Sequence, residues 1–173
     1  MGFLQNLFKS ATAPQPANPH RPAPAPAAAP VAGAIPYGID QRPQPADDHL
    51  DTLAPQQVGA FQRGKITDGT GSPGVRMHYV NYTKAGAKNP GICLGIFVHA
   101  TAAEAQQSQQ GQCQVDPGDP DCQFRFGTEP SFFHTPNTPE GSYFYFTRDR
   151  FGFQVQAWQG ADDLDAFMAA FPY

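Results

Sequence analysis

Alternating apolar and polar residues in the second half of the chain predict a β-sheet. Residues 75–83 place Val75, Met77 and Tyr79 on one side of an extended segment. Residues 92–100 are apolar on both sides, which is typical of a central strand. Three further strands are expected, and the last two of them form a hairpin: residues 123–127, 142–148 and 151–158.

Other segments have helical spacing. The clearest is residues 161–171, and we also expect helices at residues 101–110 and 52–64. In residues 161–171 the apolar positions recur every three or four residues, at Leu164, Phe167, Met168 and Phe171. These elements predict an α+β fold, in which one small domain at residues 47–173 has an antiparallel sheet of about four or five strands with two helices on one face.

Residues 1–12 form a separate amphipathic peptide. One face of a short helix would hold its large apolar residues, which are Phe3, Leu4, Leu7 and Phe8. An isolated helix of this length is marginal in water, because nucleation costs more than so few residues return. We therefore predict a docking peptide that becomes ordered only against a protein groove, a membrane surface or its own domain.

A proline-rich spacer separates this peptide from the domain. Ten of the 19 prolines lie between residues 13 and 47, many of them alternating with alanine. This composition disfavours a helix and favours an extended polyproline II arm over residues 13–46. Within the arm, Ile35, Tyr37 and Ile39 are candidates for a second small docking strip.

Charge argues against a nucleic-acid partner. Only 15% of the residues are charged, the net charge is −4, and the basic residues are scattered rather than clustered. No apolar run approaches the roughly 20 residues of a membrane-spanning helix, and the N-terminal residues lack the basic region of a secretory signal. A single nearby lysine, Lys9, makes membrane docking the weaker form of the peptide hypothesis.

The three cysteines bear on the cellular compartment. Cys113 and Cys122 flank a short loop with two prolines, so a local disulfide between them is one possibility and a pair of reduced thiols is the other. If the disulfide forms, the protein meets oxidising conditions in an exported or extracellular particle; otherwise a cytoplasmic location is expected. Cys93 lies within an expected strand and is interpreted as a small buried apolar residue.

No pattern for catalysis, a metal or a cofactor stands out. His78 and His99 lie on separate expected strands, and a shared face with Cys93 would allow a Cys/His pair. No third residue orients either histidine, so surface or core-edge histidines are the simpler interpretation. We therefore expect neither a catalytic residue nor a bound cofactor or metal.

Aromatic residues are the stronger indication of function. The C-terminal half holds more of them than one face of a small sheet can bury, and exposed aromatic clusters mark interfaces. The alternative is a hairpin that is buried on both faces. The candidate interface residues are Phe132, Phe133, His134, Tyr143, Tyr145 and Trp158.

These features predict a non-enzymatic accessory or structural component of a larger assembly, such as a virion or a secretion-type machine. The N-terminal peptide and the arm would tether it to protein partners, and the domain would act as an interaction module. Two alternatives remain: an enzyme or toxin effector that the N-terminal segment recruits to a delivery apparatus, and a membrane-peripheral protein anchored by the amphipathic peptide.

Overall fold

The computed structural model describes residues 35–173, except for residue 71, residues 114–121 and residue 139. The predicted docking peptide at residues 1–12 and most of the predicted spacer lie outside the described residues. Among the helices that are described, none is long and apolar enough to cross a membrane.

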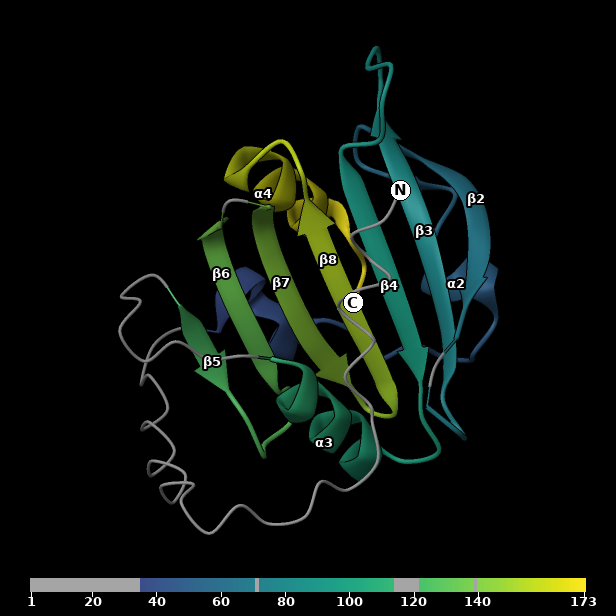
Figure 1. Ribbon diagram of the computed structural model, residues 1–173, viewed down its shortest axis with the longest axis vertical. Coiled ribbons are helices and arrows are strands. Elements are labelled where there is room, and N and C mark those ends of the chain that lie inside the picture. The colour runs from purple at the N-terminus through teal and green to yellow at the C-terminus, as the bar shows by residue number, and fades with distance from the viewer. Residues whose placement is uncertain (1–34, 71, 114–121, 139) are drawn as a thin grey trace, which may run out of the picture.

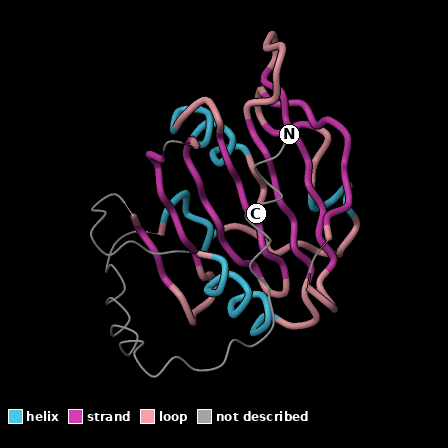
Figure 2. Tube along the Cα trace, in the orientation of Figure 1, coloured by secondary structure: helices cyan, strands magenta, loops and turns pink. Residues whose placement is uncertain are grey.

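The described chain forms one antiparallel sheet of eight strands, so the predicted α+β class with an antiparallel sheet is confirmed and the predicted strand number is too low. The strand order is β1-β2-β3-β4-β8-β7-β6-β5, and Figure 2 shows the strands side by side. The sheet thus consists of two sequential halves that meet where β4 pairs with β8. The strands are β1 (Gln57–Val58), β2 (Phe61–Gly69), β3 (Arg76–Lys84), β4 (Ile92–Val98), β5 (Gln123–Arg125), β6 (Phe132–Thr138), β7 (Gly141–Arg148) and β8 (Phe151–Ala157).

Four helical segments accompany the sheet, and the two longest lie on opposite faces of it. The α4 residues Leu164 and Phe167 pack into the same apolar cluster as Phe153 of β8. Cys113, at the end of α3, packs instead against Phe97 and Tyr145 on the other side. The predicted pair of helices on one face is therefore wrong for α3. Figure 1 shows α3 and α4 at opposite ends of the strands. The segments are the 3-10 helix η1 (Pro36–Gln41) and the α-helices α2 (Leu50–Leu53), α3 (Ala102–Gln112) and α4 (Ala161–Ala170).

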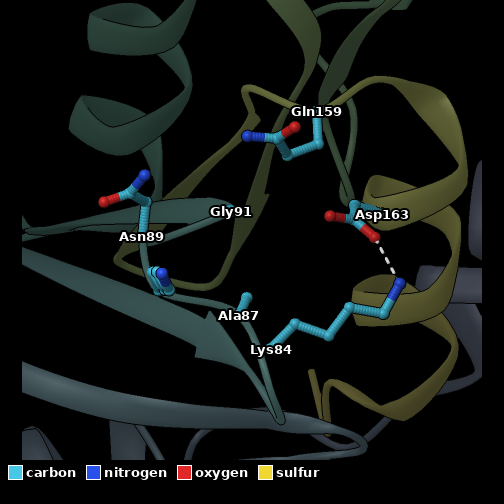
Figure 3. Close-up of a pocket in the computed structure, with 7 residues that line it drawn as sticks. Lys84, Ala87, Asn89, Gly91, Gln159 and Asp163 are labelled. Carbon is cyan, nitrogen blue, oxygen red and sulfur yellow. Dashed lines mark hydrogen bonds and ion pairs between the residues drawn. The ribbon is translucent and has the colours of Figure 1, made fainter.

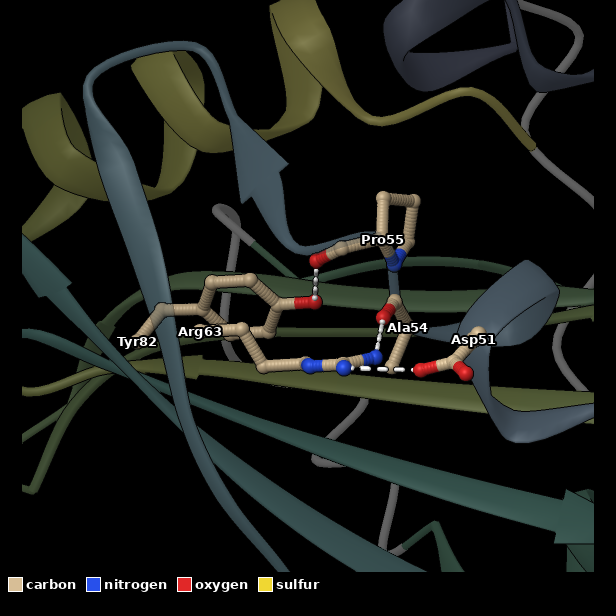
Figure 4. Close-up of polar contacts among 5 residues, drawn as sticks. All are labelled: Asp51, Ala54, Pro55, Arg63 and Tyr82. Carbon is tan, nitrogen blue, oxygen red and sulfur yellow. Dashed lines mark hydrogen bonds and ion pairs between the residues drawn. The ribbon is translucent and has the colours of Figure 1, made fainter.

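The helix predicted at residues 52–64 is wrong. Only α2 is helical there, and the chain then turns at Gly59, whose φ is +55°, between β1 and β2. Polar contacts hold the segment from α2 to Pro55 against β2 and β3 (Figure 4). Arg63 donates to a carboxylate oxygen of Asp51 at 2.7 Å, and the Tyr82 hydroxyl donates to the backbone oxygen of Pro55 at 2.9 Å. Pro55 cannot donate a helical hydrogen bond, so the local chemistry favours a turn over a continued helix.

The main core lies on one side of the sheet, which we call the first face. Cross-strand pairing places Ile96 beside Phe153, and Phe153 beside Phe146, across the centre of the sheet. These three side chains are completely buried, and Phe167 of α4 and Phe171, directly after α4, pack over them. Rows of large apolar residues from neighbouring strands supply the buried area that stabilises the fold.

Residues 35–42 form a strap that is fixed to the first face. Ile39 is fully buried in the core, and the ring of Tyr37 packs edge-on against Phe144 at 5.0 Å. The Tyr37 hydroxyl donates to a carboxylate oxygen of Asp165 at 2.8 Å, and Arg42 donates to the backbone oxygen of Tyr37 at 2.8 Å. The candidate docking strip of Ile35, Tyr37 and Ile39 therefore packs on its own domain.

Candidate functional site

The opposite side of the sheet, which we call the second face, is without charge over five strands. Pairing between β3, β4, β8, β7 and β6 fixes which residues point to it. Among the described residues of these strands, none of those pointing to the second face is Asp, Glu, Lys or Arg. They are Met77, Tyr79, Asn81, Thr83, Cys93, Gly95, Phe97, Gly152, Gln154, Gln156, Tyr143, Tyr145, Thr147, Phe133 and Thr135.

This composition differs from that of a solvated sheet face. The face of a sheet that is in contact with water usually carries charged and polar side chains. Interfaces between proteins, in contrast, are depleted of charged residues and enriched in tyrosine. Tyr79 and Tyr143 of the second face are half-buried, and Asn81 is exposed. The second face therefore lacks the charged groups that an ordinary solvated sheet face carries.

Flat aromatic packing forms the centre of this face. The rings of Phe97 and Tyr145 stack with centroids 5.6 Å apart and planes 24° apart. They lie close to the sheet because Gly95 and Gly152 have no side chains. A Cβ on Gly152 would lie 2.9 Å from the Tyr145 hydroxyl oxygen, and one on Gly95 would lie 3.2 Å from the ring of Phe97.

The helix α3 covers one part of the second face through polar contacts. Gln109 is fully buried, and its amide nitrogen donates to the backbone oxygen of Tyr145 at 2.8 Å. The Ser131 hydroxyl also contacts the amide oxygen of Gln109. Thr101 caps the helix by accepting from the backbone nitrogen of Glu104 at 3.2 Å, as its sequence position predicts. These contacts place α3 on β7 and β8.

The titratable groups of the second face stay neutral at neutral pH. Burial raises the pKa of the Cys93 thiol to about 11. Burial also raises the pKa of Tyr79, with a further contribution from Cys93, and it raises the pKa of Tyr143, with further contributions from Cys113 first and then Tyr145, Tyr79 and Cys93. Neutral thiols and phenols are poor nucleophiles and bases at pH 7.

The structure separates the residues of the Cys/His hypothesis. His78 pairs with Ile96 and points to the first face, where its Nδ1 lies 2.8 Å from a carboxylate oxygen of Asp68. Cys93 pairs with Asn81 and points to the second face. His99 follows the end of β4, and its Nε2 is buried without a hydrogen-bond partner. His78 and Cys93 therefore cannot act as a pair.

The aromatic residues predicted as an interface are mostly buried. Phe132 and Phe133 are each 6% exposed and Tyr145 is fully buried, so the expectation that these rings are exposed is corrected. The cause is that the strap and α4 cover the first face while α3 covers part of the second. His134 and Tyr143 are half-buried. Of the described residues, Trp158 is the one large apolar side chain that is exposed, at 39%.

A small open pocket lies between the β3–β4 turn and the start of α4, with a volume of about 330 Å³ (Figure 3). Lys84 donates to a carboxylate oxygen of Asp163 at 2.7 Å across it, and the ammonium group also lies 5.8 Å from the ring centre of Phe61. This ion pair joins β3 to α4 and cancels the charge of both groups, so the pocket is best explained as a structural contact.

No group of three or more His, Cys, Asp or Glu residues that could hold a metal occurs in the described part of the chain. The pairing of Cys113 with Cys122 stays a prediction, since residues 114–121 between them are not described. Burial raises the pKa of Cys113, and the nearby Cys122 adds to this effect.

Acidification should destabilise the fold because of the buried His99 and the half-buried His134. Burial lowers the pKa of His99 and of His134 below 6.5, and the carboxylates of Glu104 and Asp165 offset this only in part. The unfolded chain therefore takes up protons first, so the free energy of unfolding should be constant above about pH 6.5 and fall as the pH decreases below it. Urea unfolding at pH 7.5 and 5.5 measures this fall.

The matched variant for this measurement is His99→Gln combined with His134→Gln. It should unfold at nearly the same urea concentration at both pH values, because it removes the two groups that titrate in this window. A decrease as large as that of the parent protein would show that other groups cause the effect.

Comparison with known proteins gave no match: no family model, no curated protein and no solved structure is similar to this chain.

Proposed function

We propose that this protein is a non-enzymatic accessory or structural component of a larger assembly, such as a virion or a secretion-type machine. In this proposal the domain is an interaction module that receives a protein partner on its second face. The observation that carries it is the absence of charged side chains on that face among the described residues of five strands. Covering such a face leaves no charge buried without a partner, so the desolvation cost of binding is small.

The strap supports the second half of the proposal, which is tethering. Tyr37 and Arg42 attach the strap to α4 and to the last residues of the chain, because Tyr37 donates to Asp165 and Arg42 donates to the backbone oxygen of Phe171. The proline-rich arm therefore joins the domain at a fixed point instead of through a loose end. A tether with a fixed origin limits where a partner at its far end can sit relative to the domain.

The arm has the length that tethering requires. Residues 13–34 number 22, which corresponds to about 70 Å if the alternating proline and alanine residues are extended at about 3.1 Å each. A folded domain of this size has a radius of gyration of about 14 Å. The N-terminal peptide can therefore engage a partner well beyond the surface of its own domain.

Deleting residues 1–12 should abolish recovery of the protein with its assembly while the domain stays folded. The measurement is affinity purification of a C-terminally tagged chain from its native source, with circular dichroism as the control for folding. Phe3→Asp combined with Leu7→Asp should have the same effect, because it removes the apolar face. Normal recovery of both variants would exclude the docking role of the peptide.

The role of the second face is tested separately. Asn81→Arg introduces a charge at an exposed position of this face. A partner that covers the face must remove this charge from water, so recovery of the partner should fall at least about tenfold. Ala169→Arg, at an exposed position of α4, is the matched control. Equal recovery of the two variants would contradict the assignment of the second face.

A further inference from the structure

We propose that Cys113 and Cys122 are a disulfide site, and that oxidation of this pair fastens the end of α3 to the edge strand β5. Both residues are thiols in the structure. The pairing is one of two possibilities in the sequence, and the fold favours it by placing both residues on the second face. The bond lies within the domain, so it is independent of the proposed partner.

Cys113 lies at the C-terminal end of α3, on the second face. Its backbone nitrogen donates to the backbone oxygen of Gln109 at 3.0 Å, so the residue continues the last turn of the helix. Its side chain packs against the apolar cluster that contains Tyr145. The pKa of Tyr143 is raised first by burial, and among its titratable neighbours Cys113 contributes most. Cys113 therefore lies over β7, beside these two rings.

Strand register places Cys122 on the same face. Cys122 directly precedes β5, where Gln123 pairs with His134. Continuing this register by one residue places Cys122 level with Thr135 of β6, which itself pairs with Tyr143 of β7. Side chains that are level with each other in adjacent strands point to the same side of a sheet. Cys122 therefore points to the second face, two strands away from Tyr143.

The two thiols are close neighbours in the fold. The backbone of Cys122 lies about 10 Å from that of Tyr143, because adjacent strands are about 4.8 Å apart, and the end of α3 covers this part of the sheet. The pKa of Cys113 is raised by burial and, in addition, by Cys122. Such an effect between two thiols operates at short range, and it agrees with the positions that packing and strand register give.

Cys93, the third cysteine, is too distant from Cys122 to compete. Tyr143 pairs with Gln156, and Gln156 pairs with Cys93, on the side of β7 that is away from β5. Four strand spacings therefore separate Cys93 from Cys122, which is about 19 Å at about 4.8 Å each. A disulfide needs Cα atoms within about 7 Å of each other. Within one chain, the partner left for Cys122 is Cys113.

Formation of the bond requires an oxidant, and a small-molecule disulfide such as oxidised glutathione supplies it. The thiolate of one cysteine attacks a sulfur atom of the oxidant, which leaves a mixed disulfide and one reduced glutathione. The second thiolate attacks the mixed disulfide and releases the second reduced glutathione. The protein thus loses two protons and two electrons, and the oxidant takes up both.

The bond fastens an edge strand to a buried anchor. β5 has three residues and pairs with β6 on one side. The anchor of α3 is the buried Gln109, whose amide donates to the backbone oxygen of Tyr145 at 2.8 Å. A covalent link from α3 to β5 extends this anchor to the edge of the sheet. It also closes a loop of ten residues, which lowers the entropy of the unfolded chain and so stabilises the oxidised domain.

Mass spectrometry of the full chain tests the bond. After incubation with oxidised glutathione, unfolding and alkylation by iodoacetamide, the chain should carry one label, on Cys93, whereas the chain reduced with dithiothreitol should carry three. Cleavage after Glu104 and before Asp116 and Asp121 places the three cysteines in three different peptides. Three labels after oxidation, glutathione adducts in place of the bond, or a linked peptide that contains Cys93 would overturn the proposal. A linked species with the mass of two chains would overturn it as well.

Thermal unfolding and hydrogen exchange test the fastening of β5. The oxidised chain should have a Tm about 5–10 °C above that of the reduced chain. Cys113→Ser and Cys122→Ser should each abolish this difference, and the matched control Cys93→Ser should retain it. Amide exchange of residues 123–125 should slow at least about tenfold on oxidation. A linked chain with unchanged Tm and unchanged exchange would show that the bond does not fasten α3 to β5.

Discussion

Replacing Phe153 with alanine should lower the free energy of unfolding by about 3–5 kcal/mol, the range for large-to-small aromatic substitutions in a core. Phe153 is fully buried at the centre of the first face. Its ring stacks on Phe146 with centroids 5.2 Å apart and on Tyr173 at 5.6 Å, and it meets Phe171 edge-on at 5.5 Å. Alanine removes all three contacts and leaves a cavity that fixed neighbouring strands cannot fill. Urea unfolding followed by circular dichroism measures the loss.

Phe124→Ala is the matched control for this substitution. Phe124 is half-buried in the edge strand β5, where its ring stacks on Phe126 at 5.4 Å. Because less area is buried and the edge can relax, the expected loss is about 1 kcal/mol. A loss for Phe124→Ala that equals the loss for Phe153→Ala would contradict the central place of Phe153 in the core.

Gly141→Ala should destabilise the fold about as much as Phe153→Ala does, and it should lower the free energy of unfolding by more than about 3 kcal/mol. Gly141 begins β7 with φ at +110°, which L side chains rarely adopt. A Cβ there would lie only 2.1 Å from the backbone oxygen of Ala157. Backbone atoms of a paired strand cannot rotate away as a side chain can, so the hairpin itself would have to separate.

Gly111→Ala should stabilise the fold, in contrast to Gly141→Ala. Gly111 lies within α3, and a Cβ there would meet nothing within 4 Å. Alanine should therefore raise the free energy of unfolding by about 0.5–1 kcal/mol, because glycine is unfavourable inside a helix. Thermal unfolding of the two glycine variants side by side gives the comparison. A destabilising Gly111→Ala would indicate that α3 is distorted or covered at this position.

Strict periodicity explains which elements could be predicted from the sequence. The segment at residues 92–98 is apolar on both sides, and it is indeed a central strand with β3 and β8 as neighbours. The predicted helix at residues 161–171 corresponds to α4, whose Leu164, Phe167 and Met168 are fully buried. In both segments many side chains are buried, so the positions of the apolar residues follow the period of the strand or of the helix.

The segments near the β1 edge of the sheet could not be predicted because exposure removes the pattern. In β2, Lys65, Thr67 and Asp68 are all exposed, so the segment has the composition of a loop. Near α2, Leu53 and Val58 are both buried, although one belongs to a helix and the other to a strand. Their spacing imitates one helical face because two different elements contribute to the same core.

The second face was also hidden in the sequence, for a different reason. Each strand contributes only two to four residues to it, and short uncharged stretches are common in any chain. Only strand pairing brings Tyr79, Gly95 and Gln154 into one row. The predicted interface residue Tyr143 does lie on this face, but Phe132 points to the core on the other side.

The pairing of β4 with β8 also determines the order in which the chain can fold. During synthesis the half with β1 to β4 is complete long before β8 exists, so β4 is then an edge strand with an unpaired apolar sequence, Ile92–Val98. Such an edge is a template for pairing with other chains, and non-local strand pairing forms slowly. We therefore expect the nascent chain to be most prone to aggregation before its C-terminal half emerges and β8 covers β4.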